Sequence, residues 1–233
     1  MSRRRKRISK PIPIVYLTIP PENLEDEINK IEVNQFPAFD VLCDEFNKKG
    51  INSIRCLGIG DPCKSAAARL QTSFILKLST KCNIQNITYF DPVLCESCRS
   101  ILTRMGFECE EEDLEGFIKF SPNTAFYMPH CPRFLYHNLL LANWDESQLQ
   151  HLIIVGNSFE SYEEKVRMLK QPNSSCVEDL FATKSVHEIK LDFKGNDFFD
   201  STSLMLFCPN FLPPKEDNFW QNREKMHPTA TQS

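Results

Sequence analysis

The sequence predicts an α/β protein, a three-layer sandwich in which a mostly parallel, Rossmann-like sheet carries helices on both faces. Short runs of almost continuously apolar residues recur along the chain, as expected for parallel strands that are buried on both sides. Stretches of helix length, with apolar residues at helical spacing, separate these runs. Hydrophobic residues make up 41% of the 233 residues, which is enough apolar material for one sizeable core.

The first part of the chain predicts two helices followed by a β-α unit. Residues 24–31 and 39–46 place their apolar side chains at helical spacing, and Gly50 is suited to end the second helix. Residues 54–59 predict the first strand, and residues 63–79 predict the helix that follows it.

A second strand, helix and strand follow. Residues 87–90 are apolar and stop at Asp91, which precedes a proline. A helix then ends at Gly106, and residues 107–109 predict the next short strand. The acidic run of residues 110–115 reads as a solvated loop.

The rest of the sheet comes from four further runs. Residues 124–128 predict a buried strand that leads into a helix, residues 151–155 predict the next strand, and residues 162–169 predict one more helix. The alternating residues 189–193 and the apolar residues 204–207 predict edge or closing strands.

The ends of the chain differ from its centre. We expect residues 1–22 to form a basic, Pro-rich flexible tail, residues 23–212 a single α/β domain, and residues 213–233 a polar flexible tail. The basic cluster Arg3–Arg7 is either a nuclear-import or RNA-contact patch or simply a solvated tail.

Charge and hydropathy limit where the protein can reside and which partners it can bind. The formal net charge of −4 argues against a general nucleic-acid-binding surface, so any basic function is local to the N-terminal tail. No apolar run reaches the roughly 20 residues that a membrane-spanning helix needs. We therefore expect a cytoplasmic protein without membrane contact, and the basic cluster Arg3–Arg7 leaves a nuclear location open as well.

The ten cysteines do not form a recognisable metal or disulfide framework. Most lie inside apolar segments, where reduced, buried thiols are the simplest interpretation. Cys95 and Cys98 form a lone C-x-x-C without a second pair at zinc-finger spacing. We therefore expect these two cysteines to pack a helix and expect no metal site, with metal or redox chemistry at the C-x-x-C as the alternative.

A candidate ligand crevice follows from the loops after the predicted strands. In a parallel sheet these loops meet at the carboxyl edge, where ligands bind at a reversal of strand order. Glycines let the backbone approach a ligand, and helix starts there attract anions. The candidate residues are Gly58, Gly60, Asp61, Asp91, His130, Cys131, Tyr136, Asn138, Asn157 and Ser158.

Two interpretations are open for the loop residues Gly58, Gly60 and Asp91. They suit a nucleotide or S-adenosylmethionine site, with Asp91 accepting ribose hydroxyl groups. The G-x-G-x-x-G pattern is broken at Cys63, and a third glycine in G-x-G-x-G would fall on Pro62. Glycines in tight turns and an aspartate as helix cap explain the same residues without a ligand.

His130 and Cys131 have three competing roles: a nucleophile pair, ligands for heme iron or a metal, or a packed turn. A helix start would help Cys131 to ionise, but adjacent side chains usually point apart, which disfavours proton transfer between them.

Four other polar residues of the candidate crevice have simpler roles available. Tyr136 and Asn138 lie within the predicted helix, where a buried tyrosine normally ties its polar tip to backbone. Asn157 and Ser158 either contact a ligand or cap the helix that begins near Phe159.

A set of motifs resembles the sensitivity-to-red-light-reduced family (SRR-like proteins), in order and in spacing. The motifs are Cys56–Gly60, Tyr89–Pro92, Phe126–Cys131, Leu135–Leu140, Asn143–Trp144 and Ile154–Phe159, followed by Phe199–Ser203 and Phe207. The resemblance covers roughly residues 36–209 and makes the 23–212 domain SRR-like.

This resemblance implies a regulatory protein with no established reaction and no accepted catalytic residues. It implies a role in a circadian-clock input pathway and, in animal-type members, in control of heme biosynthesis and clock-gene expression. We expect a non-catalytic adaptor or effector-binding module with regulatory protein partners and a possible small-molecule effector. A nucleotide- or S-adenosylmethionine-dependent enzyme, methyltransferase-like in its strand-end crevice, is the alternative, and no cofactor is named.

Overall fold

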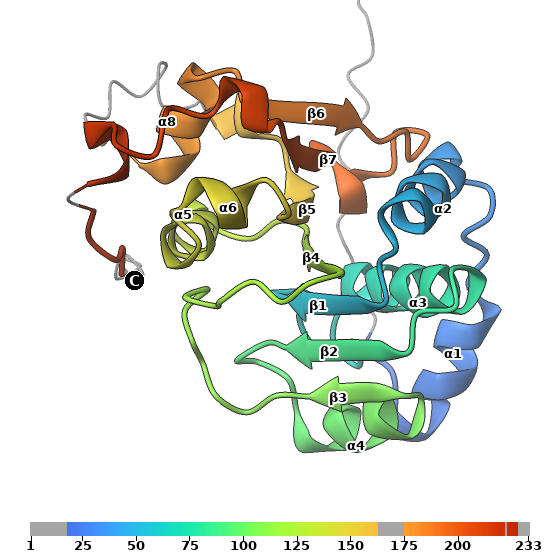
Figure 1. The fold of residues 1–233 in the computed structure, drawn as a ribbon. Coiled ribbons are helices and arrows are strands. Elements are labelled where there is room, and N and C mark those ends of the chain that lie inside the picture. Colours follow the sequence, from blue (N-terminus) through green and yellow to red (C-terminus); the bar gives the residue numbers. More distant parts are fainter. Residues whose placement is uncertain (1–17, 163–174, 222, 228–233) are drawn as a thin grey trace, which may run out of the picture.

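One sheet runs through the centre of the protein, whose computed structural model describes residues 18–162, 175–221 and 223–227 (Figure 1). The strand order is β3-β2-β1-β4-β5-β7-β6. The strands are β1 (Ser53–Leu57), β2 (Asn86–Phe90), β3 (Phe107–Cys109), β4 (Thr124–Met128), β5 (Ile153–Asn157), β6 (Val186–Lys190) and β7 (Thr202–Phe207).

Most neighbouring strands of the sheet run parallel to each other. The neighbours from β3 to β5 all pair in parallel, whereas β7 runs antiparallel to both β5 and β6. The chain order reverses between β1 and β4, because β2 and β3 lie on one side of β1 while β4 and β5 lie on the other. A crevice at the carboxyl ends of parallel strands opens at such a reversal.

Helices cover both faces of this sheet. The first layer comprises α1 (Leu24–Lys30), α2 (Pro37–Lys49), α3 (Ala66–Lys81) and α4 (Glu96–Arg104). The second layer comprises α5 (Arg133–Ala142), α6 (Glu146–Leu149) and α8 (Cys176–Ala182). The 3-10 helices are η1 (Pro21–Asn23), η2 (Asp197–Phe199), η3 (Pro209–Phe211) and η4 (Asn218–Trp220). The predicted α/β class, with its helix-covered, mostly parallel sheet, is confirmed.

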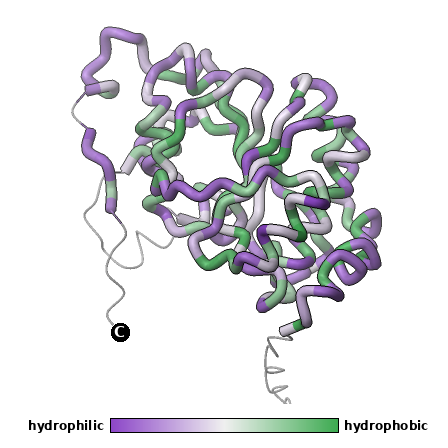
Figure 2. The backbone as a smooth tube through the Cα atoms, turned by 90° about the horizontal axis from the view of Figure 1, so that it is seen from below, coloured by the Kyte–Doolittle hydropathy of each residue, from purple (hydrophilic) through white to green (hydrophobic). Residues whose placement is uncertain are grey.

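The alternation of side chains along each strand creates two separate cores. On β4, Ala125 and Tyr127 belong to the core under the first helical layer, whereas Phe126 and Met128 belong to the core under the second. A strand buried on both sides has no polar face, which explains its unbroken apolar sequence. Figure 2 shows hydrophobic residues concentrated in the interior and hydrophilic residues along the outer segments.

The structure differs from the sequence prediction at one edge of the sheet. The predicted strand 189–193 lies three residues earlier, at β6. Leu191 and Phe193 point into the core, where the Phe193 ring stacks on Phe199 with centroids 4.0 Å apart. The carbonyl of Asp192 accepts the Ala38 N–H at 3.0 Å, so the backbone there pairs with the start of α2 and leaves the sheet.

Two short helices of the second layer, α6 and α8, were not expected from the sequence. The predicted helix 162–169 begins at residue 159 in the structure, and residues 163–174 lie outside the described part. The basic N-terminal cluster also lies outside it. None of the helices in the described ranges has the length and hydropathy of a membrane-spanning segment.

The C-terminal segment, which the sequence predicts to be a flexible tail from residue 213, contacts the second helical layer. The Trp144 ring stacks on Phe219 at 4.9 Å between centroids, and its indole N–H donates to the Phe219 carbonyl at 3.1 Å. Arg223 forms an ion pair with Asp179. These contacts extend the packed part of the chain beyond the expected domain boundary.

Candidate functional site

A cavity of about 290 Å³ opens at the carboxyl ends of β1, β2, β3 and β4, beside the reversal of strand order. Most of its lining comes from four strand ends and the loops that follow them: Leu57–Gly58 at the end of β1, Phe90–Pro92 at the end of β2, residues 112–116 after β3, and His130–Pro132 after β4. The four loops therefore share one rim, as the parallel strands require. This volume is at the small end of the range for ligand pockets.

The cavity brings together part of the predicted set. Gly58, Asp91, His130 and Cys131 line it. The other six candidates are absent from the lining, and Ser158 instead borders a separate hollow near the start of β7. The residues outside the lining are Gly60, Asp61, Tyr136, Asn138, Asn157 and Ser158.

Gly58 is required for packing against Cys131. Its φ of +69° lies in the left-handed region, and a Cβ placed there would lie 2.5 Å from Cys131 Sγ. The close neighbour of this glycine is thus a thiol of the same chain. The sequence had suggested a ligand in that place.

The Cys131 thiol is buried and neutral. It donates a hydrogen bond to the Leu57 carbonyl at 3.2 Å, and burial raises the pKa of this thiol well above its ordinary value. Asp91 adds a smaller effect in the same direction. The sequence placed Cys131 at a helix start that would favour ionisation, whereas burial shifts the pKa of this thiol in the opposite direction.

His130 points away from Cys131. Its backbone has a φ of 57°, its N–H donates to Asn157 Oδ1 at 2.8 Å, and its ring Nε2 lies 3.0 Å from the Phe198 carbonyl. The Cys131 thiol instead bonds to the Leu57 carbonyl, so the two neighbouring side chains have different partners. This arrangement does not allow direct proton transfer from thiol to imidazole.

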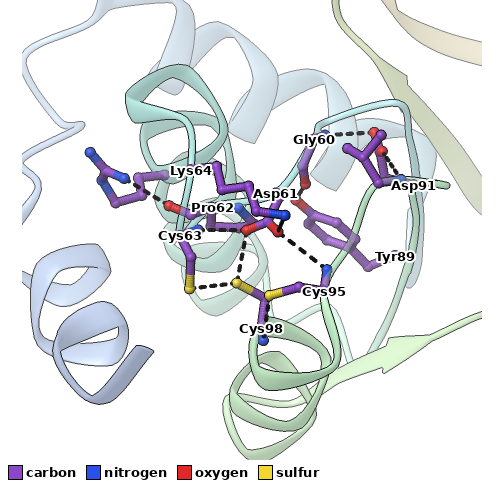
Figure 3. Close-up of polar contacts among 11 residues, drawn as sticks. Gly60, Asp61, Pro62, Cys63, Lys64, Tyr89, Asp91, Cys95 and Cys98 are labelled. Atoms are coloured by element: carbon purple, nitrogen blue, oxygen red, sulfur yellow. Dashed lines mark hydrogen bonds and ion pairs between the residues drawn. The ribbon is translucent and has the colours of Figure 1, made fainter. Parts of the chain in front are cut away.

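Asp91 links the loops after β1 and β2 (Figure 3). Its Oδ2 accepts the Gly60 N–H at 2.6 Å, and its Oδ1 accepts the Val93 N–H at 3.0 Å. Burial raises the pKa of this carboxyl group, and the two backbone hydrogen bonds oppose that shift. Both oxygens already hold loop backbone, so Asp91 shapes the cavity rim and has fewer lone pairs left for a ligand.

Tyr136 and Asn157 hold the ends of β4 and β5 together. The Tyr136 hydroxyl donates to the Met128 carbonyl and accepts the Asn157 N–H at 2.8 Å. The Asn157 amide donates to the Cys131 carbonyl at 3.2 Å. Ser158 Oγ accepts the Ser161 N–H at 3.3 Å, which is a helix-capping contact. These polar atoms serve the turn and the helix start.

An acidic wall, formed by Glu110, Glu112, Asp113 and Glu115, lines one side of the cavity. The sequence had predicted only a solvated loop here. Asn138 donates its amide to the Glu115 carbonyl at 2.7 Å, which attaches this wall to α5. The signal that sequence reasoning missed is the pair of buried asparagines on and just after α5, Asn138 and Asn143.

Asn143 fixes the next part of the same loop. Its Oδ1 accepts the Phe120 N–H at 2.6 Å, and its Nδ2 donates to the Ile118 carbonyl at 2.8 Å. A buried amide that satisfies loop backbone in this way replaces the hydrogen bonds that a strand or helix would supply.

Carboxylates dominate the electrostatics of the cavity. Arg55 lines it too, but its guanidinium is already paired with Glu110 at 2.7 Å. Glu115 is paired with Lys225 at 2.8 Å, which lowers the pKa of that carboxyl group. Glu112, Asp113 and Asp91 add further negative charge to the described lining. Such a cavity favours neutral or cationic ligands over phosphates.

Comparison with known proteins gives one consistent set of relatives. Residues 24–225 match the family model of the SRR1 domain. An SRR1-like protein of Drosophila melanogaster is 29% identical over 174 residues, which are 74% of this chain and 62% of that protein. An SRR1-like protein of Mus musculus is 36% identical over 135 residues, 54% of each chain.

A plant relative and a solved structure are also similar. Protein SENSITIVITY TO RED LIGHT REDUCED 1 of Arabidopsis thaliana is 30% identical over 144 residues, 61% of this chain and 52% of that one. The crystal structure of N,N-8-amino-8-demethyl-D-riboflavin dimethyltransferase from Streptomyces davawensis has a TM-score of 0.37 at 11% identity, covering 72% of this chain and 53% of that one. The chain spans between 52% and 62% of the length of these curated relatives.

Proposed function

Because the chain belongs to the SRR1 domain family, as its motifs predicted, we propose that it is a non-catalytic regulatory module whose cavity binds a small effector. The supporting observation is the cavity itself, to which four strand-end loops contribute at the reversal of strand order. An effector in this cavity contacts all four loops and so alters the surface that partner proteins contact.

The state of the polar groups in the cavity supports a binding role over a catalytic one. Cys131 is a buried, neutral thiol, His130 faces away from it, and Asp91 is engaged with backbone. A nucleophile needs a base within hydrogen-bonding reach, and the described lining residues do not supply that pair. The remaining function is recognition by shape and charge.

The charge of the lining defines the effector class. We infer a small neutral or cationic molecule, such as an amine or a polyol, because the acidic wall repels phosphate groups. Heme is a poor fit to this cavity, since its two carboxylates would meet the acidic wall and Cys131 Sγ is enclosed by Leu57 and Gly58.

A second candidate is S-adenosylmethionine, whose sulfonium group is a cation. The observation in its favour is the combination of Asp91 at the end of β2 with the acidic wall beside it. Under this alternative the domain is a methyltransferase-like enzyme, and S-adenosylmethionine is the one strong binder among the adenosine-containing compounds.

Thermal shift with a panel of amines, polyols, S-adenosylmethionine, NAD and ATP tests both candidates. A ligand at roughly 100 times its Kd adds about 2.7 kcal/mol of stability, which raises Tm by roughly 5–10 °C in a domain of this size. We expect neutral or cationic compounds to raise Tm and ATP and NAD to leave it unchanged. A response to S-adenosylmethionine alone selects the second candidate.

Two variants, each with a matched control, test whether the ligand binds in this cavity. Leu114→Trp fills the cavity and should abolish the shift, whereas Val41→Trp on exposed α2 surface should preserve it. Glu112→Gln removes a lining charge and should weaken cationic ligands, whereas Glu111→Gln, next to it but outside the lining, should not. A Tm shift that survives Leu114→Trp contradicts the proposed site.

The biological role that we propose is regulation of a circadian-clock input pathway, of heme biosynthesis and of clock-gene expression. The name of the Arabidopsis relative, which refers to red-light sensitivity, supports a role in light or clock signalling. Such a role needs regulatory protein partners and residence in cytoplasm and nucleus. Cells that carry Leu114→Trp should show altered clock-gene rhythms, and cells that carry Val41→Trp should not.

A further inference from the structure

Four side chains with metal-binding atoms converge beside the cavity, outside its lining. Asp61 and Cys63 come from the loop between β1 and α3, and Cys95 and Cys98 come from the start of α4 (Figure 3). One donor atom from each residue lies within 4.8 Å of all the others. Three of these residues are buried, and Cys95 is partly exposed.

The backbone around the cluster holds the donors in place. Asp61 Oδ1 accepts the Cys63 N–H at 2.8 Å, and Asp61 Oδ2 accepts the Cys95 N–H at 3.2 Å. The carboxylate thus connects two loops that are more than thirty positions apart in the sequence. Cys95 is the N-cap residue of α4, and its Sγ accepts the Cys98 N–H at 3.4 Å.

We propose that Asp61, Cys63, Cys95 and Cys98 bind a zinc ion that joins the loop after β1 to the loop after β2. Zinc in structural sites takes four ligands in a tetrahedron, and thiolate, imidazole and carboxylate are its usual donors. Three soft sulfur donors with one carboxylate oxygen match zinc better than magnesium or calcium, which prefer oxygen alone.

The spacing of the donors fits a tetrahedral ion after a small opening of the cluster. Zn–S bonds of about 2.3 Å place neighbouring sulfurs about 3.8 Å apart, which lies inside the span of the cluster. Cys98 Sγ lies 2.6 Å from Cys63 Sγ and 3.0 Å from Asp61 Oδ1, so these two sulfurs must separate when the ion enters. Side-chain rotation supplies that movement without moving the helix.

Zinc binding at this cluster requires no oxidant or reductant. The ion replaces the thiol protons of Cys63, Cys95 and Cys98, three protons pass to solvent, and three Zn–S bonds form. The Asp61 carboxylate supplies the fourth bond. Two zinc charges against three thiolates and one carboxylate leave a net charge of minus two. The Lys64 ammonium, 3.1 Å from Asp61 Oδ2, and the N–H groups of the loops offset part of it.

Metal analysis of the full chain tests this proposal. The protein is purified reduced, without a metal-binding tag, from zinc-supplemented cells, and zinc is measured by mass spectrometry of the elements. We expect one zinc ion per chain. Cys95→Ser and Cys98→Ser should each weaken zinc binding by roughly 100-fold or more. The matched control Cys82→Ser, outside the cluster, should retain the ion.

Cobalt provides a second readout that reports the ligands directly. Co²⁺ in place of zinc gives intense visible bands when it is tetrahedral, together with sulfur-to-metal charge transfer whose intensity follows the number of thiolates. We expect this charge transfer to decrease in Cys95→Ser and to remain unchanged in Cys82→Ser.

Several results would overturn the zinc site. Wild-type protein that contains no zinc and takes up no cobalt after reduction contradicts it. So does zinc retained at full affinity by both variants, or an intact mass two hydrogens too low because Cys63 and Cys98 form a disulfide. If circular dichroism shows that Cys98→Ser does not fold, the partly exposed Cys95→Ser decides the question.

Discussion

At the residue scale, two buried tyrosines show how the effect of a hydroxyl group on stability depends on its hydrogen-bond partners. The buried Tyr136 hydroxyl bonds to two backbone groups, the carbonyl of Met128 and the N–H of Asn157. The Tyr127 hydroxyl is also buried, on β4, but it has no hydrogen-bond partner among the described residues. A buried polar group stabilises only when it is paired, and an unpaired one costs free energy.

We predict opposite effects when each hydroxyl is removed. Tyr136→Phe should lower the free energy of unfolding by about 1–3 kcal/mol, because the Asn157 N–H loses its partner and the Met128 carbonyl keeps only the longer hydrogen bond from the Cys131 N–H at 3.4 Å. Tyr127→Phe should be neutral or stabilising, because it removes an unpaired group from the core. Urea unfolding of both variants measures the difference. Equal losses would show that the hydroxyl of Tyr136 does not join β4 to β5.

At the scale of elements, helix α5 connects the acidic wall, the C-terminal segment and helix α8. Asn138 binds the acidic wall through Glu115 and the C-terminal segment through Met226. The next residue toward the N-terminus, His137, donates from Nε2 to the Glu224 carbonyl at 2.9 Å and accepts the Cys176 N–H of α8 on Nδ1 at 3.1 Å. The imidazole is therefore neutral, with its proton on Nε2.

The burial of His137 predicts a loss of stability in acid. Desolvation lowers the pKa of His137 below its ordinary value, and the hydrogen bond to Glu224 opposes this only partly. The unfolded state therefore takes up a proton first as the pH falls through about 6.5, so that stability present above this pH is lost below it. A proton on Nδ1 would also oppose the Cys176 N–H.

Unfolding in urea at about pH 7.5 and about pH 5.5 measures this effect. Wild type should lose up to about 1 kcal/mol through His137 over this interval. His137→Gln should be less stable but should show a smaller pH dependence. The same change at exposed His187 on β6 serves as the control and should keep the wild-type pH dependence. An unchanged dependence in His137→Gln would contradict the assignment.

At the scale of the whole molecule, the sequence predicted the sheet and the convergence of its strand-end loops. Apolar runs reveal strands because burial on both faces excludes polar residues. The end of β6 was misplaced because Leu191 and Phe193 continue the apolar alternation after the backbone has turned to α2. The end of β6 is set by a hydrogen bond between residues that are far apart in the sequence. The local sequence pattern does not contain that information.

The site was predicted less completely, for the same physical reason. Gly58, Asp91, His130 and Cys131 could be placed on the rim, because strand direction alone sets their position. The acidic wall could not, because amide contacts from Asn138 hold it. The Asp61 and Cys63 pair joins Cys95 and Cys98 only after β1 and β2 lie side by side, so the lone C-x-x-C looked structural.

Protein-detected NMR with a library of small neutral and cationic fragments tests the central claim, that four strand-end loops form one binding cavity. Fragments that bind should shift the amide signals of Gly58, Asp91, Gly116 and His130 together, and Leu114→Trp should abolish these shifts. Binders that shift signals elsewhere while leaving these four unchanged, or shifts that persist in Leu114→Trp, would contradict the claim.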